Sequence, residues 1–490
     1  MLAAVAMSSC NSKESDEPSY EPAESVAVKN FSIAPNARVM ADLDSVYFSI
    51  DLARGIIFNA DSLPKGTAID KLVPVITYPS TVKKAIIKME GGTTREGTVD
   101  YTESPTDSID FTGRVTLTLS TADNLLSHTY QIKVNVHTMV ADSLMWDKVA
   151  VSQLPSRLSA PREQRTVSYG DKVYTMLRES DNSLTLATCD NPADNNWSRQ
   201  TLNLPFTPAL RSLTASDDAL YILSDSGLLY RSADGANWTS TSTVWHNIIG
   251  GFGNTVTGIY TDGNGEYMHD IYPRPQGFTP TVTDPEFPVD GISDFYTFSS
   301  KWSTDPIGFF VGGSRAGVLS GATWSFDGSN WACTSNTPLP ALESPLLIPY
   351  FNYRKTATSW LQTEYSVLLC LGGRLPDGSI NPDIYISYDN GVNWQKASSL
   401  LQLPEYIAPV VNADAVIRTT PMSASLDAYW KDLDTKTPRD VKRIQYFVDG
   451  SDVDWDCPYI YMFGGHTAGG NLQDEILRAV LARLTFSPLF

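Results

Sequence analysis

Cysteine, histidine and long hydrophobic runs are scarce in this sequence, and each scarcity removes a class of protein. Five Cys in 490 residues stand singly, without CxxC spacing, so we predict no zinc ribbon, thioredoxin-type site or disulfide. Cys333 and Cys370 lie in strand-like runs and are expected to be buried thiols. Five His without an HExxH arrangement make hydrolytic zinc unexpected. No run of about 18 apolar residues predicts a membrane-spanning helix.

Basic side chains are also scarce: 36 Lys and Arg face 55 Asp and Glu, and the formal net charge is −19. Binding to nucleic acid requires a clustered basic face, so we expect no nucleic-acid partner. At 490 residues with 42% hydrophobic side chains, the chain suits two domains, one of them large. Gly, Pro, Asn, Asp and Ser recur about every eight to twelve residues, which is typical of turns between short strands.

The first residues predict export. Residues 1–10, MLAAVAMSSC, form an apolar run that ends in small residues and Cys10. The run resembles the end of a bacterial lipoprotein signal, although it is short and no Lys or Arg precedes it. Residues 11–24 read as a polar tether that does not fold alone. The resemblance implies a protein at the outer membrane or cell surface that contacts the membrane only through a lipid on Cys10. The alternative is a frayed N-terminus with a chance Cys.

Residues 25–140 are expected to form an immunoglobulin-like β-sandwich of about seven short strands. Apolar and polar residues alternate with period two, as in half-exposed antiparallel strands, in residues 46–52, 84–89, 113–120 and 129–137. The amino-acid sequence of residues 59–76 and of the closing strand at 130–136 resembles that of bacterial Ig-like surface domains. That resemblance implies a stalk or spacer.

Residues 145–490 carry three copies of one turn pattern, at 232–238, 325–331 and 387–394. The copies resemble the Asp-box, SxDxGxxW, of β-propeller blades. We expect the Ser and Asp side chains to bond turn amides and the Trp to fold under the hairpin, which is a structural role. The residues assigned that role are Asp234, Trp238, Asp327, Trp331, Asp389 and Trp394.

A second repeat places Gly-Gly at the end of apolar strands, as in kelch blades, at residues 250–251, 312–313, 372–373 and 464–465. Together the repeats predict six blades, centred at residues 165–205, 210–245, 246–290, 305–340, 362–400 and 440–486. Residues 476–484 fit a helix or a strand, and we predict a strand by analogy with closing blades. A strand near Met145 is expected to complete that last blade and so remove the free edge of the ring.

The predicted fold class is therefore all-β, with an Ig-like β-sandwich followed by a kelch/Asp-box-like six-bladed β-propeller. This tandem resembles an uncharacterised family of Bacteroidetes surface lipoproteins over nearly the whole chain. The resemblance brings no known activity.

No catalytic motif stands out. Asp-boxes occur in sialidases, but the Arg-Ile-Pro element of that family has no match at residues 160–165 or 272–275. Hydrolases with paired carboxylates stay open, because their spacing is spatial rather than sequential. Residues 452–456 carry a carboxylate at every second position, as calcium-binding loops do. They lack the Gly and the distal Glu of an EF-hand. We predict no metal site and no cofactor.

The predicted ligand site is the mouth of the propeller. Residues directly after Gly-Gly occupy equivalent loops, so Arg315, Arg374 and His466 are expected to emerge on one face near the axis and bind an anion. The alternative is that these Arg pair with Asp across blades. Aromatic-rich loops are expected to add stacking surfaces for sugar rings. The residues of those loops are Trp302, Tyr350, Tyr353, Arg354 and Trp360.

These features favour a cell-surface binding lipoprotein whose propeller mouth recognises a glycan or a surface protein. Two alternatives stay open: a structural component of an outer-membrane assembly, and a glycan-active enzyme, sialidase-like or another hydrolase. The protein is expected to be a monomer or part of an assembly. Two carboxylates about 5–10 Å apart in the axial funnel would favour the enzyme, and a large apolar patch would favour the assembly.

Overall fold

The computed structural model describes residues 25–59, 62–80, 82–121, 125–137, 140, 143–298, 305–353, 364–424 and 453–482. They form two compact units, one ending at Val140 and the other comprising the described residues from 143 onward. Within these ranges the only helices are three-residue 3-10 turns, namely η1 (Leu43–Ser45), η2 (Pro192–Asp194) and η4 (Ser399–Leu401). The all-β prediction is therefore confirmed. No helix in these ranges has the length and hydrophobicity to cross a membrane.

The first unit contains eight strands in two sheets that share one hydrophobic core. Period-two burial is clear in β5 (Lys84–Glu90), where Ala85, Ile87 and Met89 are buried and Lys84 and Lys88 are exposed. The six-stranded sheet has the order β2 (Ser49–Asp51), β3 (Ile56–Phe58), β8 (Ser127–Lys133), β7 (Arg114–Ser120), β5 (Lys84–Glu90), β6 (Gly97–Asp100), and the small sheet pairs β1 (Asn30–Ile33) with β4 (Pro74–Thr77). The eight described strands compare with about seven expected, and β3 runs parallel to β8. The Ig-like assignment stays a prediction.

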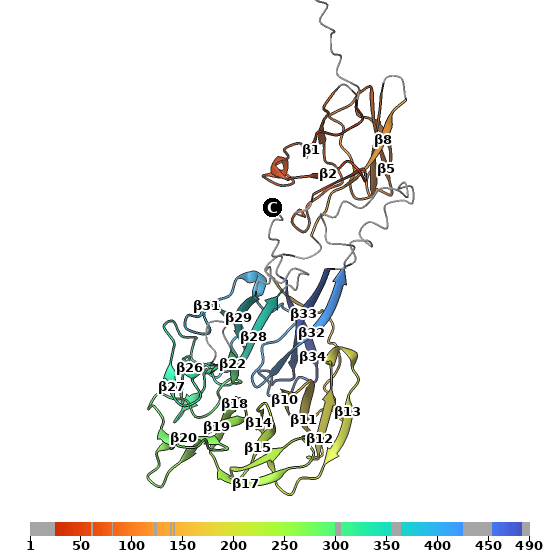
Figure 1. Cartoon of the computed structure of the whole chain (residues 1–490). Helices are drawn as coiled ribbons and strands as arrows, with labels where there is room; N and C mark the ends of the chain where they lie inside the picture. The colour runs from red at the N-terminus through yellow and green to blue at the C-terminus, as the bar shows by residue number, and fades with distance from the viewer. Residues whose placement is uncertain are drawn as a thin grey trace, which may run out of the picture. The chain divides into compact units, whose positions relative to one another are not determined.

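The second unit is a ring of six four-stranded antiparallel blades, which confirms the predicted six-bladed propeller (Figure 1). Blades 1 to 3 are β10 (Glu163–Tyr169), β11 (Lys172–Arg178), β12 (Leu184–Cys189), β13 (Ser198–Leu202); β14 (Pro208–Ala215), β15 (Leu220–Ser224), β16 (Leu228–Ser232), β17 (Thr239–Val244); and β18 (Asn247–Phe252), β19 (Thr255–Thr261), β20 (Tyr267–Tyr272), β21 (Thr281–Val282).

Blades 4 to 6 follow the same plan. They are β22 (Tyr296–Phe298), β23 (Ile307–Val311), β26 (Thr323–Phe326), β27 (Trp331–Cys333); β28 (Leu346–Tyr353), β29 (Glu364–Leu371), β30 (Tyr385–Ser387), β31 (Gln395–Lys396); and β32 (Asp414–Ala424), β33 (Val453–Phe463), β34 (Ile476–Ala482), β9 (Ser143–Trp146). A separate two-stranded hairpin joins β24 (Ser314–Arg315) to β25 (Val318–Leu319).

The last blade is closed by the first strand of the unit. Strand β9 pairs antiparallel with β34, with Trp146 opposite Ala479 and Leu144 opposite Leu481. Both predictions about this blade are confirmed for the described residues: Ile476–Ala482 form a strand, and a strand that contains Met145 closes the blade. The closure joins the two ends of the unit in one sheet, so the ring has no unpaired end blade.

The core of the propeller is divided among the interfaces between consecutive blades. Between blades 4 and 5, for example, Phe309 and Val311 of β23 pack with Leu347, Leu368 and Cys370 of the next blade. Equivalent clusters lie at the other five interfaces. Each blade therefore depends on both neighbours for burial of its two faces, and stability is shared around the ring.

Three of the four Gly-Gly pairs follow the second strand of a blade, at the ends of β23, β29 and β33. This is the position that the kelch-like pattern predicts. The pair at Gly250 and Gly251 was predicted to end a strand as well, and that prediction is wrong: both residues lie inside β18, the first strand of blade 3.

Close backbone approach explains the glycines in β18. A Cβ atom on Gly250 would stand 2.3 Å from the Phe295 side chain, and one on Gly251 would stand 1.9 Å from the Ala215 carbonyl oxygen. Phe295 precedes β22 and Ala215 ends β14, so β18 is squeezed between the neighbouring blades. Only glycine allows this spacing.

The predicted Asp-box turns make the expected bonds in blade 2. The Ser232 hydroxyl accepts from the Gly235 amide at 2.8 Å, and Asp234 Oδ1 accepts from the Asn237 amide at 2.8 Å. The Trp238 indole donates to the Gly235 carbonyl oxygen at 2.8 Å. The hydrogen bond from the Asn237 amide is the main reason that the pKa of Asp234 falls to about 2. The aspartate thus has a structural role.

In blade 5 the same pattern also connects two blades. Asp389 Oδ1 accepts from the Asn393 amide at 2.9 Å and from the Ser387 hydroxyl at 2.8 Å. The Trp394 indole donates to the Thr323 hydroxyl of blade 4 at 3.0 Å. The tryptophan therefore packs against the preceding blade rather than only under its own hairpin.

The two strand cysteines differ in burial. Cys370 is buried in β29, and burial raises the pKa of its thiol. Cys333 was predicted to be buried too, but it is exposed. It ends β27, the outermost strand of blade 4, and no described strand pairs with the outer edge of β27.

Candidate binding site

The first strands of all six blades surround a cavity on the propeller axis. Its lining comes from β10, β14, β18, β22, β28 and β32 and from the segments that lead into them. Its volume is about 690 Å³, within the range of about 300–1,000 Å³ that is usual for small-molecule sites. Because every blade contributes to the lining, the cavity exists only in the closed ring.

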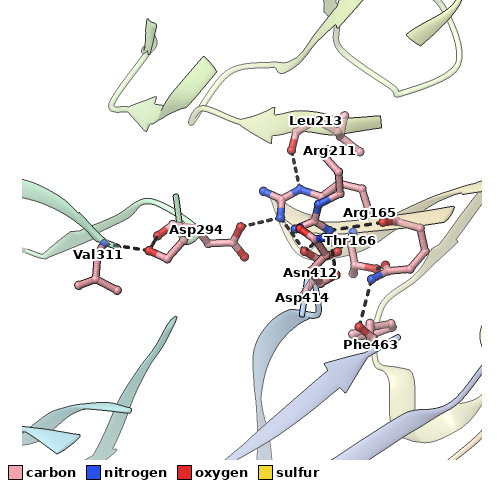
Figure 2. Close-up of polar contacts among 11 residues, drawn as sticks. Arg165, Thr166, Arg211, Leu213, Asp294, Val311, Asn412, Asp414 and Phe463 are labelled. Atoms are coloured by element: carbon pink, nitrogen blue, oxygen red, sulfur yellow. Dashed lines mark hydrogen bonds and ion pairs between the residues drawn. The ribbon is translucent and has the colours of Figure 1, made fainter. Parts of the chain in front are cut away.

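A buried ion-pair cluster, formed by Arg165, Arg211, Asp294 and Asp414, lies at one end of this cavity (Figure 2). Arg165 Nη1 lies 2.5 Å from Asp294 Oδ1 and 2.6 Å from Asp414 Oδ1. Its Nε donates to the Leu213 carbonyl oxygen at 3.0 Å. Only 10% of the Arg165 side chain is exposed, so these bonds replace its hydration.

Asp414 is the fixed member of the cluster. Its side chain has no exposed surface. Oδ1 accepts from both Arg165 and Arg211 Nη1, and Oδ2 accepts from the Thr166 amide at 2.7 Å. Both oxygens of this blade 6 carboxylate are therefore occupied by donors from blades 1 and 2.

Asp294 is held more loosely. Its carboxylate is 16% exposed, and Arg165 is the one bonding partner found for it in the described part of the chain. Asp294 belongs to the segment before β22, which lies beside β23 because the Ser293 amide donates to the Val311 carbonyl oxygen at 3.0 Å. Asp294 thus comes from blade 4, whereas Arg165 comes from blade 1.

The Arg165–Asp294 pair crosses the propeller axis. Blades 1 and 4 lie opposite each other, because two blades stand between them in either direction around the ring. Figure 2 shows Asp294 reaching from its own side toward the guanidinium of Arg165. A bond between opposite blades spans the cavity at this end.

The cluster perturbs the pKa values of its members. Burial raises the pKa of Asp294, and Asp414 adds to this, against the opposing effect of the two arginines. Burial by itself lowers the pKa of Arg165, but Asp294 and Asp414 raise it overall, so the guanidinium stays charged. Burial and then Asp294 raise the pKa of the Tyr296 hydroxyl, which therefore stays protonated.

Arg211 is the more accessible of the two arginines, with 33% of its side chain exposed. Its Nη1 bonds Asp414 at 2.9 Å and the Asn412 carbonyl oxygen at 3.2 Å. Within the described part of the chain, the bonds of this guanidinium all use Nη1. Because Arg211 lines the cavity and is partly exposed, its planar donor fork can meet a ligand there.

A second ion pair lies at the same end of the lining. His246 Nε2 stands 2.8 Å from Asp290 Oδ1, and this bond raises the pKa of His246 despite partial burial. Both residues precede first strands, β18 and β22 respectively.

The geometry bears on the hydrolase alternative. Both aspartate oxygens contact one nitrogen of Arg165, so they lie within about 5 Å of each other, near the separation of about 5–5.5 Å in retaining glycosidases. Those enzymes need two accessible carboxyl groups, and Asp414 has no exposed surface. The Asp294–Asp414 pair is therefore suited to holding charge rather than to general acid and nucleophile chemistry.

No cluster of three or more His, Cys, Asp or Glu side chains suited to a metal ion occurs among the residues that the structure describes.

The predicted mouth residues lie at the expected end of the propeller. Because β28 pairs antiparallel with β29, with Leu346 opposite Leu371, the loop after β29 lies beside the start of β28. Backbone bridges join Arg374 to Glu343 and His466 to Val411 in this way. None of Arg315, Arg374 and His466 is among the residues that line the axial cavity.

Local contacts occupy the two predicted arginines. Arg315 Nη1 donates to the Thr283 hydroxyl at 2.9 Å and to the Asp284 carbonyl oxygen at 2.8 Å, and its guanidinium lies over the Tyr267 ring. Arg374 forms an ion pair with Glu343 at 3.6 Å. Both side chains tie their own loops to an adjacent segment, and the structure does not bring them together at the axis.

Tyr350 is among the residues that line the axial cavity, but the structure gives it neither the predicted loop position nor an exposed ring. This residue lies in β28 rather than in a loop, its side chain is fully buried, and its hydroxyl donates to the Pro458 carbonyl oxygen at 2.9 Å. Tyr353 ends the same strand. Cys10, Trp302, Arg354 and Trp360 lie outside the described residues.

Sequence reasoning missed the ion-pair cluster. The available signal was positional: Arg165 and Arg211 both stand early in the first strand of successive blades, and Asp414 begins the first strand of blade 6. First strands line the axis, so charged residues within them are candidates for an axial site.

Two family models match the chain, one over each unit. The family described as "DUF6242 beta propeller domain" matches residues 140–489, and the "Domain of unknown function (DUF6242) N-terminal domain" matches residues 23–134. No curated protein matches the sequence.

Three solved structures illustrate how distant the structural likenesses are. The N-terminal domain of Nup159 is 11% identical, with a TM-score of 0.31 and coverage of 64% of this chain and 75% of that one. YjhT is 11% identical, with a TM-score of 0.29 and coverage of 66% and 96%. Trypanosoma rangeli sialidase with the inhibitor DANA is 11% identical, with a TM-score of 0.34 and coverage of 66% and 55%. These likenesses carry no argument about ligand or activity.

The two family matches together span both units of the structure. The chain therefore belongs to the DUF6242 family, as an N-terminal domain of unknown function followed by a β-propeller.

Proposed function

We propose that this protein is a binding module whose propeller takes the end of a glycan chain in the axial cavity. One observation carries the proposal: a cavity of about 690 Å³, lined by all six blades, in which Arg211 is the most exposed member of the ion-pair cluster. A protein partner of ordinary size needs about 800 Å² of contact on each side. A concave site of this volume suits a sugar unit better.

The lining has the mixed chemistry that sugars require. Ser168, Thr214 and Asn247 bring hydroxyl and amide groups, while the partly exposed Ile292 and Ile417 bring aliphatic surface. Sugar rings present hydroxyl groups at their edges and C–H groups on their faces, so they pair with polar and apolar side chains at once. Binding is favoured over hydrolysis because one carboxylate of the Asp294–Asp414 pair is fully buried.

The cellular setting is a proposal from the sequence. Lipidation at Cys10, within residues 1–24, would anchor the chain at the outer membrane or cell surface, and the first unit would act as a spacer. A surface location gives the propeller access to extracellular glycans. The surplus of acidic residues is compatible with this role.

A glycan-array screen of the purified full chain tests the proposal. We expect binding to a restricted set of glycans that share a terminal sugar, because the cavity holds a chain end rather than a chain segment. Each hit should also raise the thermal unfolding midpoint of the propeller, since a ligand that binds only the folded state stabilises it by mass action.

Two results would contradict the proposal. One is the absence of any bound glycan on an array that includes neutral and acidic structures. The other is binding without a thermal shift at saturating ligand, which would place the contact outside the folded ring.

A further inference from the structure

We propose that the glycan bound in the axial cavity carries a single carboxylate, which replaces Asp294 at the guanidinium groups of Arg165 and Arg211. This inference rests on the proposed function and assigns the chemical class of its ligand, an acidic sugar at the end of an otherwise neutral chain.

The two aspartates differ in burial and in the number of bonds that they accept. Asp414 is fully buried and accepts from Arg165, Arg211 and the Thr166 amide. Asp294 is 16% exposed, comes from a segment outside the strands, and bonds Arg165 alone among the described residues. A competing carboxylate from a ligand would therefore displace Asp294 and leave Asp414 in place.

The position of the Arg165–Asp294 pair also favours the exchange. Asp294 and Arg165 approach from opposite blades and meet across the cavity, so this bond lies at the end where Arg211 is accessible. A ligand carboxylate placed here meets two guanidinium groups, the donors best matched to its planar geometry. The exchange replaces one carboxylate with another, so the guanidinium of Arg165 keeps an anionic partner.

Charge and size restrict the ligand further. The chain has a formal net charge of −19, which repels polyanions, so one carboxylate is favoured over a uronate polymer. The cavity of about 690 Å³ is far larger than a carboxylate alone. Hydroxyl and amide side chains in the lining give the rest of a sugar its partners.

The experiment uses two copies of one glycan array, one untreated and one with its carboxyl groups reduced to primary alcohols. We expect the wild-type full chain to bind acidic glycans on the untreated copy and to lose at least about tenfold in signal on the reduced copy. Equal binding on both copies overturns this inference and leaves the proposed function standing. No binding on either copy overturns both.

The Asp294→Asn variant tests the exchange itself. Removing the internal competitor should raise affinity for the best acidic glycan by about tenfold, because the competent state no longer has to displace a carboxylate. The matched control is Asp218→Asn, which removes the carboxylate of an exposed ion pair with Arg231 and should change affinity less than about twofold. Unchanged or weaker binding by folded Asp294→Asn would overturn the exchange.

Competition with acetate distinguishes a site for an acidic sugar from a site for any carboxylate. Acetate at the glycan's own concentration should not compete, because it fills little of the cavity. Competition by acetate at equal concentration would overturn the assignment to a sugar. The comparison of array copies uses wild-type protein, so the inference stays testable even where the Asn variant fails to fold.

Discussion

Replacing Arg165 with alanine should destabilise the propeller by about 3–5 kcal/mol, because the change leaves Asp414 buried with half of its charge compensation. Asp414 has no exposed surface and cannot recover water as a partner. Asp294 loses its bond as well. The measurement is denaturant unfolding of the propeller followed by tryptophan fluorescence.

Two further variants serve as comparisons for Arg165→Ala. Arg231→Ala removes an arginine from a 3.0 Å ion pair with Asp218, but its side chain is 41% exposed, so the loss should be at most about 1 kcal/mol. Arg165→Lys keeps the charge but not the planar fork that reaches Asp414 and the Leu213 carbonyl oxygen together, and should fall in between. A loss for Arg165→Ala no larger than that for Arg231→Ala would contradict a structural role for the cluster.

Replacing Met145 with proline should open the ring at its closing strand. The Asp147 amide donates to the Arg478 carbonyl oxygen at 2.9 Å, so residues 147 and 478 form a hydrogen-bonded pair. Bonded pairs alternate along an antiparallel ladder, which makes Met145 and Val480 the next bonded pair. Proline removes that donor and leaves the Val480 carbonyl oxygen without its partner, which should cost about 1–3 kcal/mol.

The effect should reach the whole ring. Strand β9 also brings Leu144 and Trp146 into the core between blades 5 and 6, so its release exposes both neighbouring blades. Calorimetry should show a transition lowered by several degrees and broadened. Met145→Ala keeps the amide and serves as the control. Equal transitions for the two variants would show that closure through β9 contributes little.

Local repeats made the architecture predictable. Turn patterns such as Ser232–Trp238 and the Gly-Gly pairs after second strands act within one blade, so their spacing along the chain reveals the blade count. The closing strand was found from the need to pair the ring's free edge. The misplaced pair in β18 had a different cause, the close approach of two neighbouring blades, which a dipeptide pattern does not encode.

The site was not predictable by the same means. Asp294 and Asp414 stand 129 and 249 positions from Arg165, and neither is part of a motif. Each resembles an ordinary polar residue near a strand end until the ring closes. The arginines after Gly-Gly were more visible because they repeat in register, yet repetition there serves loop attachment at Glu343 and Thr283.

The central claim is that ligand binds at the axis rather than at the outer loops. Titration of the strongest array hit against Arg211→Ala and against the double variant Arg315→Ala/Arg374→Ala tests it most directly. We expect Arg211→Ala to lose at least about tenfold in affinity and the double variant to bind like wild type. Wild-type affinity in Arg211→Ala together with loss in the double variant would contradict the account and move the site to the Gly-Gly loops.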